Sequence, residues 1–326
     1  MSSPMRVKRI SAVLLYAALA GAVFSGAAFP AGEKSIFIVV SGPLGPYRKA
    51  ITGFKNELIE QNISAKYEEF DFSASVEKEA DLAGKLKEAA PDLVMAVGTE
   101  AGRRAGNIVK NIPVVFSMVL NPVENGVVSS LTRPSGNVTG VSLDISIDGQ
   151  FGLMKKLAPS MARVGMLYDA KRMGWQKDRA LAAAESKGLS LLAVPIYLES
   201  EVLAATGKIC GETDFMWAAP DPLIYNAVSA QNILLVTLRE KKPFMAFSSY
   251  YVGAGALAAQ ECDYEDVGKQ AGQIAIKIFG GRSPESIPVE APRKTRLFIN
   301  AEIAKLIGLD ISKDILDEAY KIFRNL

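Results

Sequence analysis

Two almost continuously apolar runs stand on either side of a helical stretch in the first half of the chain. They are Asp92 to Thr99 and Ile112 to Val119, and the stretch between them runs from Glu100 to Asn111. A strand that is apolar on both faces is typical of a parallel sheet covered by helices, because its side chains are buried on both sides. These runs therefore predict an α/β fold with parallel strands.

The same alternation of strand and helix patterns occurs before and after these runs. Ser35 to Ser41 predicts a strand, and Pro46 to Gln61 predicts a helix with one apolar face. Between the two series of strands lies a Pro-, Gly- and Asn-rich stretch, Asn121 to Asp144, which is typical of a crossing between domains. The strands predicted in the second series are Arg163 to Tyr168, Leu189 to Leu198, Asp214 to Ala219 and Pro243 to Phe247. We therefore predict two doubly wound parallel-sheet lobes.

The N-terminus has the three-part layout of a secretory signal peptide. Arg6, Lys8 and Arg9 precede an uncharged apolar run, Ile10 to Phe24, which is followed by small residues up to Ala28. The run is shorter than the ~20 apolar residues of a spanning helix, although an uncleaved anchor remains the alternative. We predict that residues 1–28 are removed and that the mature protein is free in the periplasm.

Composition excludes several classes of function. The chain has no histidine, which removes the usual nitrogen ligands of metals and the commonest general base. The net charge of +2 falls close to neutrality once the signal is removed, so nucleic-acid binding has no support. No nucleophile with a base forms a recognisable motif, so we predict no enzyme, no cofactor and no metal.

The only two cysteines, Cys210 and Cys262, do not form a CxxC redox motif. An oxidising compartment permits a disulfide between them. We place them in different lobes, so buried thiols are favoured over a disulfide, which stays open as the alternative.

The residues from Asn121 to Asp144 read NPVENGVVSSLTRPSGNVTGVSLD. With this block the chain resembles the ABC-transporter substrate-binding family that includes the tryptophan-binding proteins. Two departures leave the ligand's identity open: Asn121 stands where the family usually has Asp, and Pro222 follows Asp221 where Asn is more typical. Further matches are VGTEA at 97–101, IPVVF at 112–116, APDP at 219–222, GALAA from 255, DYEDVG from 263 and FIN from 298.

The resemblance implies a type I periplasmic-binding fold, in which the chain crosses three times between two lobes that close on a ligand. By that analogy, the helix predicted from Asp263 to Phe279 returns to the first lobe, and the tail from about Pro288 rejoins the second. The implied division is residues 33–144 plus 252–286 for the N-terminal lobe, and 145–251 plus 287–326 for the C-terminal lobe. The ligand cleft lies between them.

Small or polar residues follow the predicted strands. In doubly wound sheets ligands bind outside the carboxyl ends of the strands, where loop amides and helix N-termini converge. Thr99 is predicted to cap the helix that follows it. The resemblance places Asp221 in the cleft, as an acceptor for a ligand ammonium group; the alternative is a turn aspartate bonded to its own backbone. The candidate ligand-binding residues are Ser41, Gly42, Leu44, Gly98, Thr99, Glu100, Ser117, Asp144, Asp221, Pro222, Ser248, Ser249 and Tyr251.

The functional hypothesis follows from the resemblance. We predict the periplasmic solute-binding component of an ABC importer, a monomer that binds a small polar molecule and docks on an ABC permease in the inner membrane. The favoured ligand is an amino acid with an aromatic or apolar side chain. The alternative is a periplasmic ligand sensor that feeds a membrane receptor kinase. The basic residues Arg293, Lys294 and Arg296 are predicted to form a solvated face, with docking on the importer as the alternative.

Overall fold

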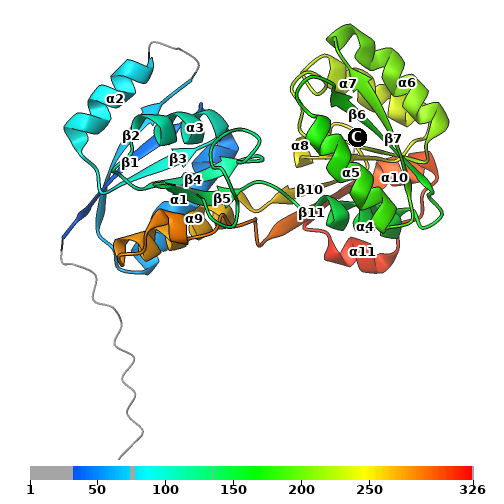
Figure 1. Cartoon of the computed structure of the whole chain (residues 1–326). Helices are drawn as coiled ribbons and strands as arrows, with labels where there is room; N and C mark the ends of the chain where they lie inside the picture. The colour runs from blue at the N-terminus through cyan, green and yellow to red at the C-terminus, as the bar shows by residue number, and fades with distance from the viewer. Residues whose placement is uncertain (1–31, 74–77, 135, 325–326) are drawn as a thin grey trace, which may run out of the picture. The chain divides into compact units, whose positions relative to one another are not determined.

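The computed structural model describes residues 32–73, 78–134 and 136–324 (Figure 1). The predicted signal peptide lies outside these residues. Within them, the chain forms two α/β lobes, each built on its own mainly parallel sheet. The prediction of two doubly wound lobes is therefore confirmed. No helix in the described ranges is both long enough and apolar enough to span a membrane.

The first lobe contains a five-stranded parallel sheet in the order β2-β1-β3-β4-β5. Every residue of β3 and β4 is buried, as their apolar sequences predict. One face of the sheet packs against α1 and α9, and the other against α2 and α3. The strands are β1 (Lys34–Val40), β2 (Ala65–Asp71), β3 (Leu93–Val97), β4 (Val114–Val119) and β5 (Val138–Ser142), and the helices are α1 (Gly45–Glu60), α2 (Lys78–Ala89), α3 (Thr99–Ile108) and α9 (Tyr264–Phe279).

The second lobe contains a seven-stranded sheet in the order β12-β11-β10-β9-β8-β6-β7. Only the β10–β11 pair is antiparallel within the described sheet. Helices α4, α5, α10 and α11 cover one face, and α6 and α7 cover the other. The strands are β6 (Arg163–Asp169), β7 (Ser190–Ile196), β8 (Phe215–Trp217), β9 (Phe244–Ala246), β10 (Ala258–Cys262), β11 (Thr295–Asn300) and β12 (Lys321–Phe323). The helices are α4 (Ile147–Leu157), α5 (Gly174–Ser186), α6 (Val202–Glu212), α7 (Ser229–Arg239), α8 (Ser249–Gly253), α10 (Ala301–Ile307) and α11 (Lys313–Glu318).

Helix α9 returns to the first lobe, as the resemblance implies, and packs against α1 (Figure 1). Two glycines make the close approach possible. A Cβ at Gly53 would lie 1.9 Å from the carbonyl oxygen of Glu265, and one at Gly268 would lie 1.9 Å from that of Ala50. Because no side chain fits there, the two helix backbones are nearly in contact.

The crossings lie at different positions from those predicted. Residues 252–262 were expected in the first lobe, but β10 hydrogen-bonds to β9 and β11 of the second sheet. Residues 287–290 were expected in the second lobe, yet Glu290 donates its amide to the carbonyl of Gly140 in β5. The apolar stripe of α9 predicted a buried helix, and the resemblance placed that helix in the first lobe. The hydrophobic pattern of the sequence did not indicate where the adjoining strands β10 and β11 end.

The three crossings run side by side. The Cys262 thiol donates to the Leu143 carbonyl at 3.5 Å, and the Asp263 amide donates to the Lys294 carbonyl at 3.0 Å. Cys262 ends β10 of the second sheet, but its side chain packs in the core of the first lobe, whereas Cys210 lies in α6 of the second lobe. Both cysteines are buried free thiols, as favoured from the sequence.

Candidate functional site

A cavity of about 680 Å³ opens beside the crossings, mainly against the second lobe. Its volume falls in the range of ~300–1,000 Å³ that is typical of small-molecule sites. Helices α4 and α5, the end of β8, strand β10 and the first crossing all contribute to its wall. The polar and aromatic lining residues include Asp144, Gln150, Trp175, Gln176, Arg179, Trp217, Phe247, Ser248, Glu261 and Tyr264.

The apolar part of the cavity contains four aromatic side chains, and two of these are the only tryptophans of the chain. Trp217 is 1% exposed and held in place from two sides. Its indole nitrogen donates to Gln150 Oε1 at 2.9 Å, and its ring meets Phe151 edge-on at 5.3 Å between centroids. The aromatic wall is therefore rigid where Trp217 forms it.

Two opposite charges meet at one end of the cavity, around Asn121. Arg179 Nη1 donates to Asn121 Oδ1 at 3.1 Å, and the Asn121 amide donates to Asp144 Oδ1 at 2.9 Å. The Arg179 guanidinium also stands 5.3 Å from the centroid of the Trp175 ring, at cation–π distance. The pair offers a cation for a ligand carboxylate and an acceptor for a ligand ammonium group.

The pKa of Asp144 lies above its ordinary value. Burial is the main cause, since it disfavours the charged carboxylate. The amide of Asn121, the charge of Arg179 and the hydroxyl of Ser142 act in the opposite direction but do not cancel it. The ionised form of such a buried carboxylate is stabilised when a cation, such as a ligand ammonium group, binds beside it.

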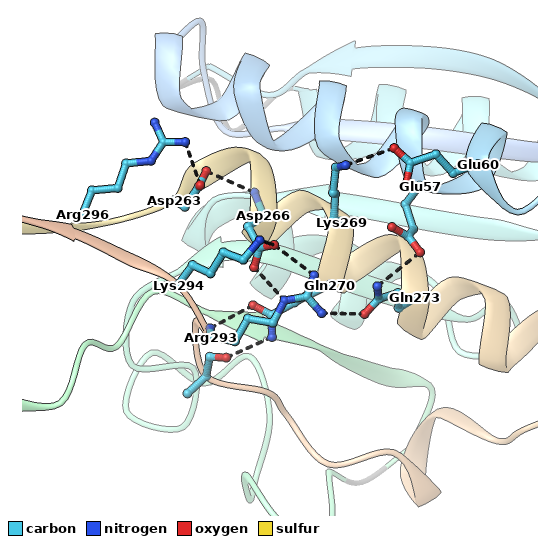
Figure 2. A network of polar contacts seen from close by, with 11 residues as sticks. Glu57, Glu60, Asp263, Asp266, Lys269, Gln270, Gln273, Arg293, Lys294 and Arg296 are labelled. Carbon is cyan, nitrogen blue, oxygen red and sulfur yellow. Dashed lines mark hydrogen bonds and ion pairs between the residues drawn. The ribbon is translucent and has the colours of Figure 1, made fainter. Parts of the chain in front are cut away.

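Beside the cavity, the return crossings are tied by a network of ion pairs (Figure 2). Arg293 donates to both oxygens of Asp266, at 2.8 and 3.0 Å, and Arg296 donates to Asp263 at 2.7 Å. The pKa of Asp266 is lowered, because the bonds from Arg293 and Lys294 outweigh its burial. The basic side chains are solvent-accessible, as expected of a solvated face, with 41% of Arg293 and 64% of Lys294 exposed. They also hold α9 to the chain that leads into β11.

Of the candidate residues chosen from the sequence, Asp144 and Ser248 line the cavity. Ser248 precedes α8 as its N-cap residue. Beside it, the amide of Ser249 donates to Glu261, which also lines the cavity. Tyr251 packs against Phe247 at 4.9 Å between ring centroids and donates to the Tyr225 carbonyl, so it supports the wall from behind.

The first-lobe candidates gather at the ends of β1, β3 and β4, outside the wall of this cavity. Ser41 Oγ accepts the Ala101 amide at 2.9 Å, so it satisfies the N-terminus of α3 from a neighbouring loop. Gly98 is the N-cap residue, with φ +94°, and Thr99 is the first helical residue. The predicted capping by Thr99 was therefore wrong. Gly42 and Leu44 lead into α1, where Leu44 is 53% exposed.

Glu100 forms ion pairs within its own helix, with Arg103 at 2.9 Å and Arg104 at 3.1 Å. Burial opposes its ionisation, but the bonds from the two arginines outweigh that effect, so the pKa of Glu100 is lowered. Its charge is thus already matched by side chains of α3.

Ser117 lies in β4 with no exposed surface, and its hydroxyl has no hydrogen-bond partner among the described residues. Two non-glycine residues with left-handed backbone follow it, Met118 at φ 60° and Asn121 at φ 49°. The pairing of β4 with β5 shifts register over the same residues. Strain and unmet polar groups of this kind gather at functional sites.

Asp221 is 4% exposed, and its carboxylate is used by the backbone. One oxygen accepts the Asp169 amide at 2.9 Å and the other accepts the Leu223 amide at 3.0 Å. The carboxylate thus joins the ends of β6 and β8, while Pro222 beside it is exposed. This geometry favours the turn role over the ligand contact.

Sequence reasoning missed the contribution of α5. Trp175, Gln176 and Arg179 line the cavity from its first two turns. The sequence predicts an ordinary connecting helix here, and the rule that ligands bind at strand ends does not apply to the face of a helix. The spacing of Trp175 and Arg179, four residues apart, was the available signal, since such residues share one helix face. Among the described residues, no group of three or more His, Cys, Asp or Glu side chains is arranged to hold a metal ion.

Comparison with known proteins agrees with this architecture. The sequence pattern of the family described as "ABC transporter substrate binding protein" matches residues 35–323. The chain is 34% identical over 235 residues to the tyrosine-binding protein of Clostridioides difficile (strain R20291), covering 71% of this chain and 67% of that protein.

Two solved structures share the fold. A ligand-free, open substrate-binding protein with adhesive properties from Clostridium difficile matches with a TM-score of 0.79 and 26% identity, covering 90% of this chain and 100% of that one. The ABC domain from Streptococcus pneumonia in complex with L-Trp matches with a TM-score of 0.71 and 24% identity over the same shares. The family match spans nearly all the described residues, and the chain therefore belongs to the ABC transporter substrate-binding proteins, with a type I periplasmic-binding fold.

Proposed function

We propose that this chain is the exported binding component of an ABC importer and that its ligand is an amino acid with an aromatic side chain. The family match supports the transport role. The relative in Clostridioides difficile, which is named a tyrosine-binding protein, supports the ligand class. The partner is an ABC permease of the inner membrane, and the place of action is the periplasm.

The observation that carries the ligand class is the composition of the cavity. It combines four aromatic side chains, at Trp175, Trp217, Phe247 and Tyr264, with the opposite charges of Arg179 and Asp144. An aromatic amino acid offers the complementary groups, namely a flat apolar ring, a carboxylate and an ammonium group. We assign the carboxylate to Arg179 and the ammonium group to Asp144.

Ligand capture by closure of the lobes completes the proposal. In the closed form, the first-lobe loops Ser41–Leu44 and Gly98–Glu100, with Ser117, are the proposed opposite wall of the site. The three adjacent crossings act as the hinge. In hinge motions, the backbone changes are confined to a few residues at the ends of the elements that the hinge joins.

The test is thermal unfolding of the protein lacking residues 1–28, freed of co-purified ligand by unfolding and refolding, against a panel of amino acids, purines and sugars. Ligand at about 100 times its Kd stabilises the folded state by about 2.7 kcal/mol, which raises Tm by about 5 °C or more. We expect this increase with tyrosine or tryptophan. A panel in which only sugars or purines raise Tm would contradict the proposal.

A further inference from the structure

One buried side chain in the cavity has no part in any bond described so far. Gln176 lies in the first turn of α5, is 6% exposed and lines the cavity. Its side-chain amide forms no hydrogen bond with another described residue. A polar group in such a position costs folding free energy unless a partner meets it.

The other buried glutamine of the cavity shows the contrast. Gln150 is 8% exposed, and its Oε1 accepts the indole N–H of Trp217 at 2.9 Å. Its role is to fix the aromatic wall. The Gln176 side chain makes no such bond among the described residues, so its N–H donors and its carbonyl acceptor are available to a ligand in the cavity that it lines.

The position of Gln176 relative to the charged groups indicates which part of a ligand it meets. Arg179 lies three residues further along α5, and it bonds to Asn121 beside Asp144. Three residues advance about 4.5 Å along the helix axis. An amino acid held by Arg179 and Asp144, with its ring directed towards the start of α5, would bring the far edge of that ring to Gln176.

We propose that Gln176 hydrogen-bonds the polar atom on the ring of the ligand and so determines specificity for tyrosine over phenylalanine. This inference rests on the proposed function. The carboxamide matches a phenol, because it accepts from the hydroxyl and donates to it. A site built to bond a ligand hydroxyl rejects the analogue that lacks it, since the buried amide then stays unpaired.

The experiment compares Kd values for tyrosine and phenylalanine in wild-type protein and in Gln176→Leu, measured by isothermal titration calorimetry on the protein freed of ligand. We expect wild type to bind tyrosine about 10- to 100-fold more tightly. In Gln176→Leu the ratio should fall to about 3-fold or less, through weaker binding of tyrosine alone. Gln231→Leu, on the exposed surface of α7, is the matched control and should keep the wild-type ratio.

Gln176→Asn provides a second variant if Gln176→Leu does not fold, since it keeps the amide but withdraws it by one methylene group. It should lower the ratio in the same direction. An equal loss of affinity for both ligands would overturn the inference, because the amide would then contact the groups that they share. An unchanged ratio would overturn it as well. If wild type bound neither amino acid, the proposed function itself would fail. The wild-type titration alone shows this, so that failure is distinct from a failure of the inference about Gln176.

Discussion

The loops at the strand ends of the first lobe lie outside the cavity wall, whereas the face of α5 in the second lobe lines it, and the two regions use their polar groups differently. In the first lobe, Ser41 accepts an α3 amide and Glu100 pairs with two arginines of its own helix. On α5, the Gln176 amide is unbonded, and Arg179 makes a single hydrogen bond, to Asn121. The first region supplies a fixed shape, whereas the second retains unused bonding capacity for a ligand.

Two aspartates show the same difference at closer range. Asp221 directs both carboxylate oxygens to backbone amides. Asp144 accepts one backbone amide, lines the cavity, and has a pKa raised by burial. A strand-end aspartate is therefore a candidate for ligand binding only when the backbone leaves its carboxylate free.

The largest expected effect is a loss of stability in Asp221→Ala without a loss of ligand affinity. Asp221→Ala leaves the buried amides of Asp169 and Leu223 without acceptors. Each such loss costs about 1–3 kcal/mol, so the free energy of unfolding should fall by about 2–4 kcal/mol. Urea unfolding measures this, and calorimetry on the folded fraction should give an unchanged Kd for the ligand. A variant with wild-type stability and no ligand binding would contradict this and show that Asp221 contacts the ligand.

Arg179→Met tests the cavity from the opposite direction. Removal of a charge-assisted bond to the ligand carboxylate should raise Kd by about 10- to 100-fold, with little change in stability. The matched control is Arg239→Met, whose side chain is 72% exposed and pairs only with Glu240 among the described residues. Equal affinities in the two variants would show that the carboxylate binds elsewhere.

Gly98→Ala tests the fixed shape of the first-lobe loops. At φ +94° a Cβ would lie 2.6 Å from Ser41 Oγ and 2.7 Å from the Tyr47 hydroxyl. We expect a loss of about 1–3 kcal/mol in the free energy of unfolding, because that backbone region is nearly restricted to glycine. Gly42→Ala, where a Cβ meets nothing within 4 Å, should change stability little. Equal stability of both variants would contradict the tight loop geometry.

Asp144→Asn should have the smallest effect on folding. The pKa of Asp144 is higher in the folded state than in the unfolded state. At pH values between these two pKa values, the folded state therefore binds more protons than the unfolded state. Its contribution to stability is thus highest below the unfolded pKa and declines as the pH rises through the folded pKa. The variant should lack this decline and be no less stable than wild type at pH 7, while Kd rises by about 10-fold. A variant with a steeper decline would contradict the raised pKa.

Much of the fold was predictable because burial on both faces leaves a clear mark on a sequence. The apolar runs located β3 and β4, and the spacing of Val267, Ala271 and Ile274 located α9. Strand β5 was missed, because VTGVS lies inside a stretch dominated by turn residues. Strands β10 and β11 were missed because their ends serve as crossings. A crossing depends on contacts between distant segments, which the local sequence pattern does not record.

The site was less predictable than the fold. The rule that ligands bind at strand ends located Ser248 in the wall of the cavity, and Asp144, at the end of the Asn121–Asp144 block, was a further candidate that lies there. It gave no means of separating Asp221 from Asp144, because hydrogen bonds to backbone amides leave no trace in composition or spacing. It also passed over Gln176 and Arg179, which reach the cavity from the surface of a helix.

The central claim is that the ligand binds against the two tryptophans of the cavity, Trp175 and Trp217, which are the only ones in the chain. The direct test is a titration of the ligand-free protein with L-tyrosine, with tryptophan fluorescence excited where tyrosine does not absorb. We expect a saturable change with the same Kd as calorimetry, and a much smaller change in Trp175→Phe. Calorimetric binding with no change in tryptophan fluorescence would contradict it, because the ligand would then lie away from this cavity.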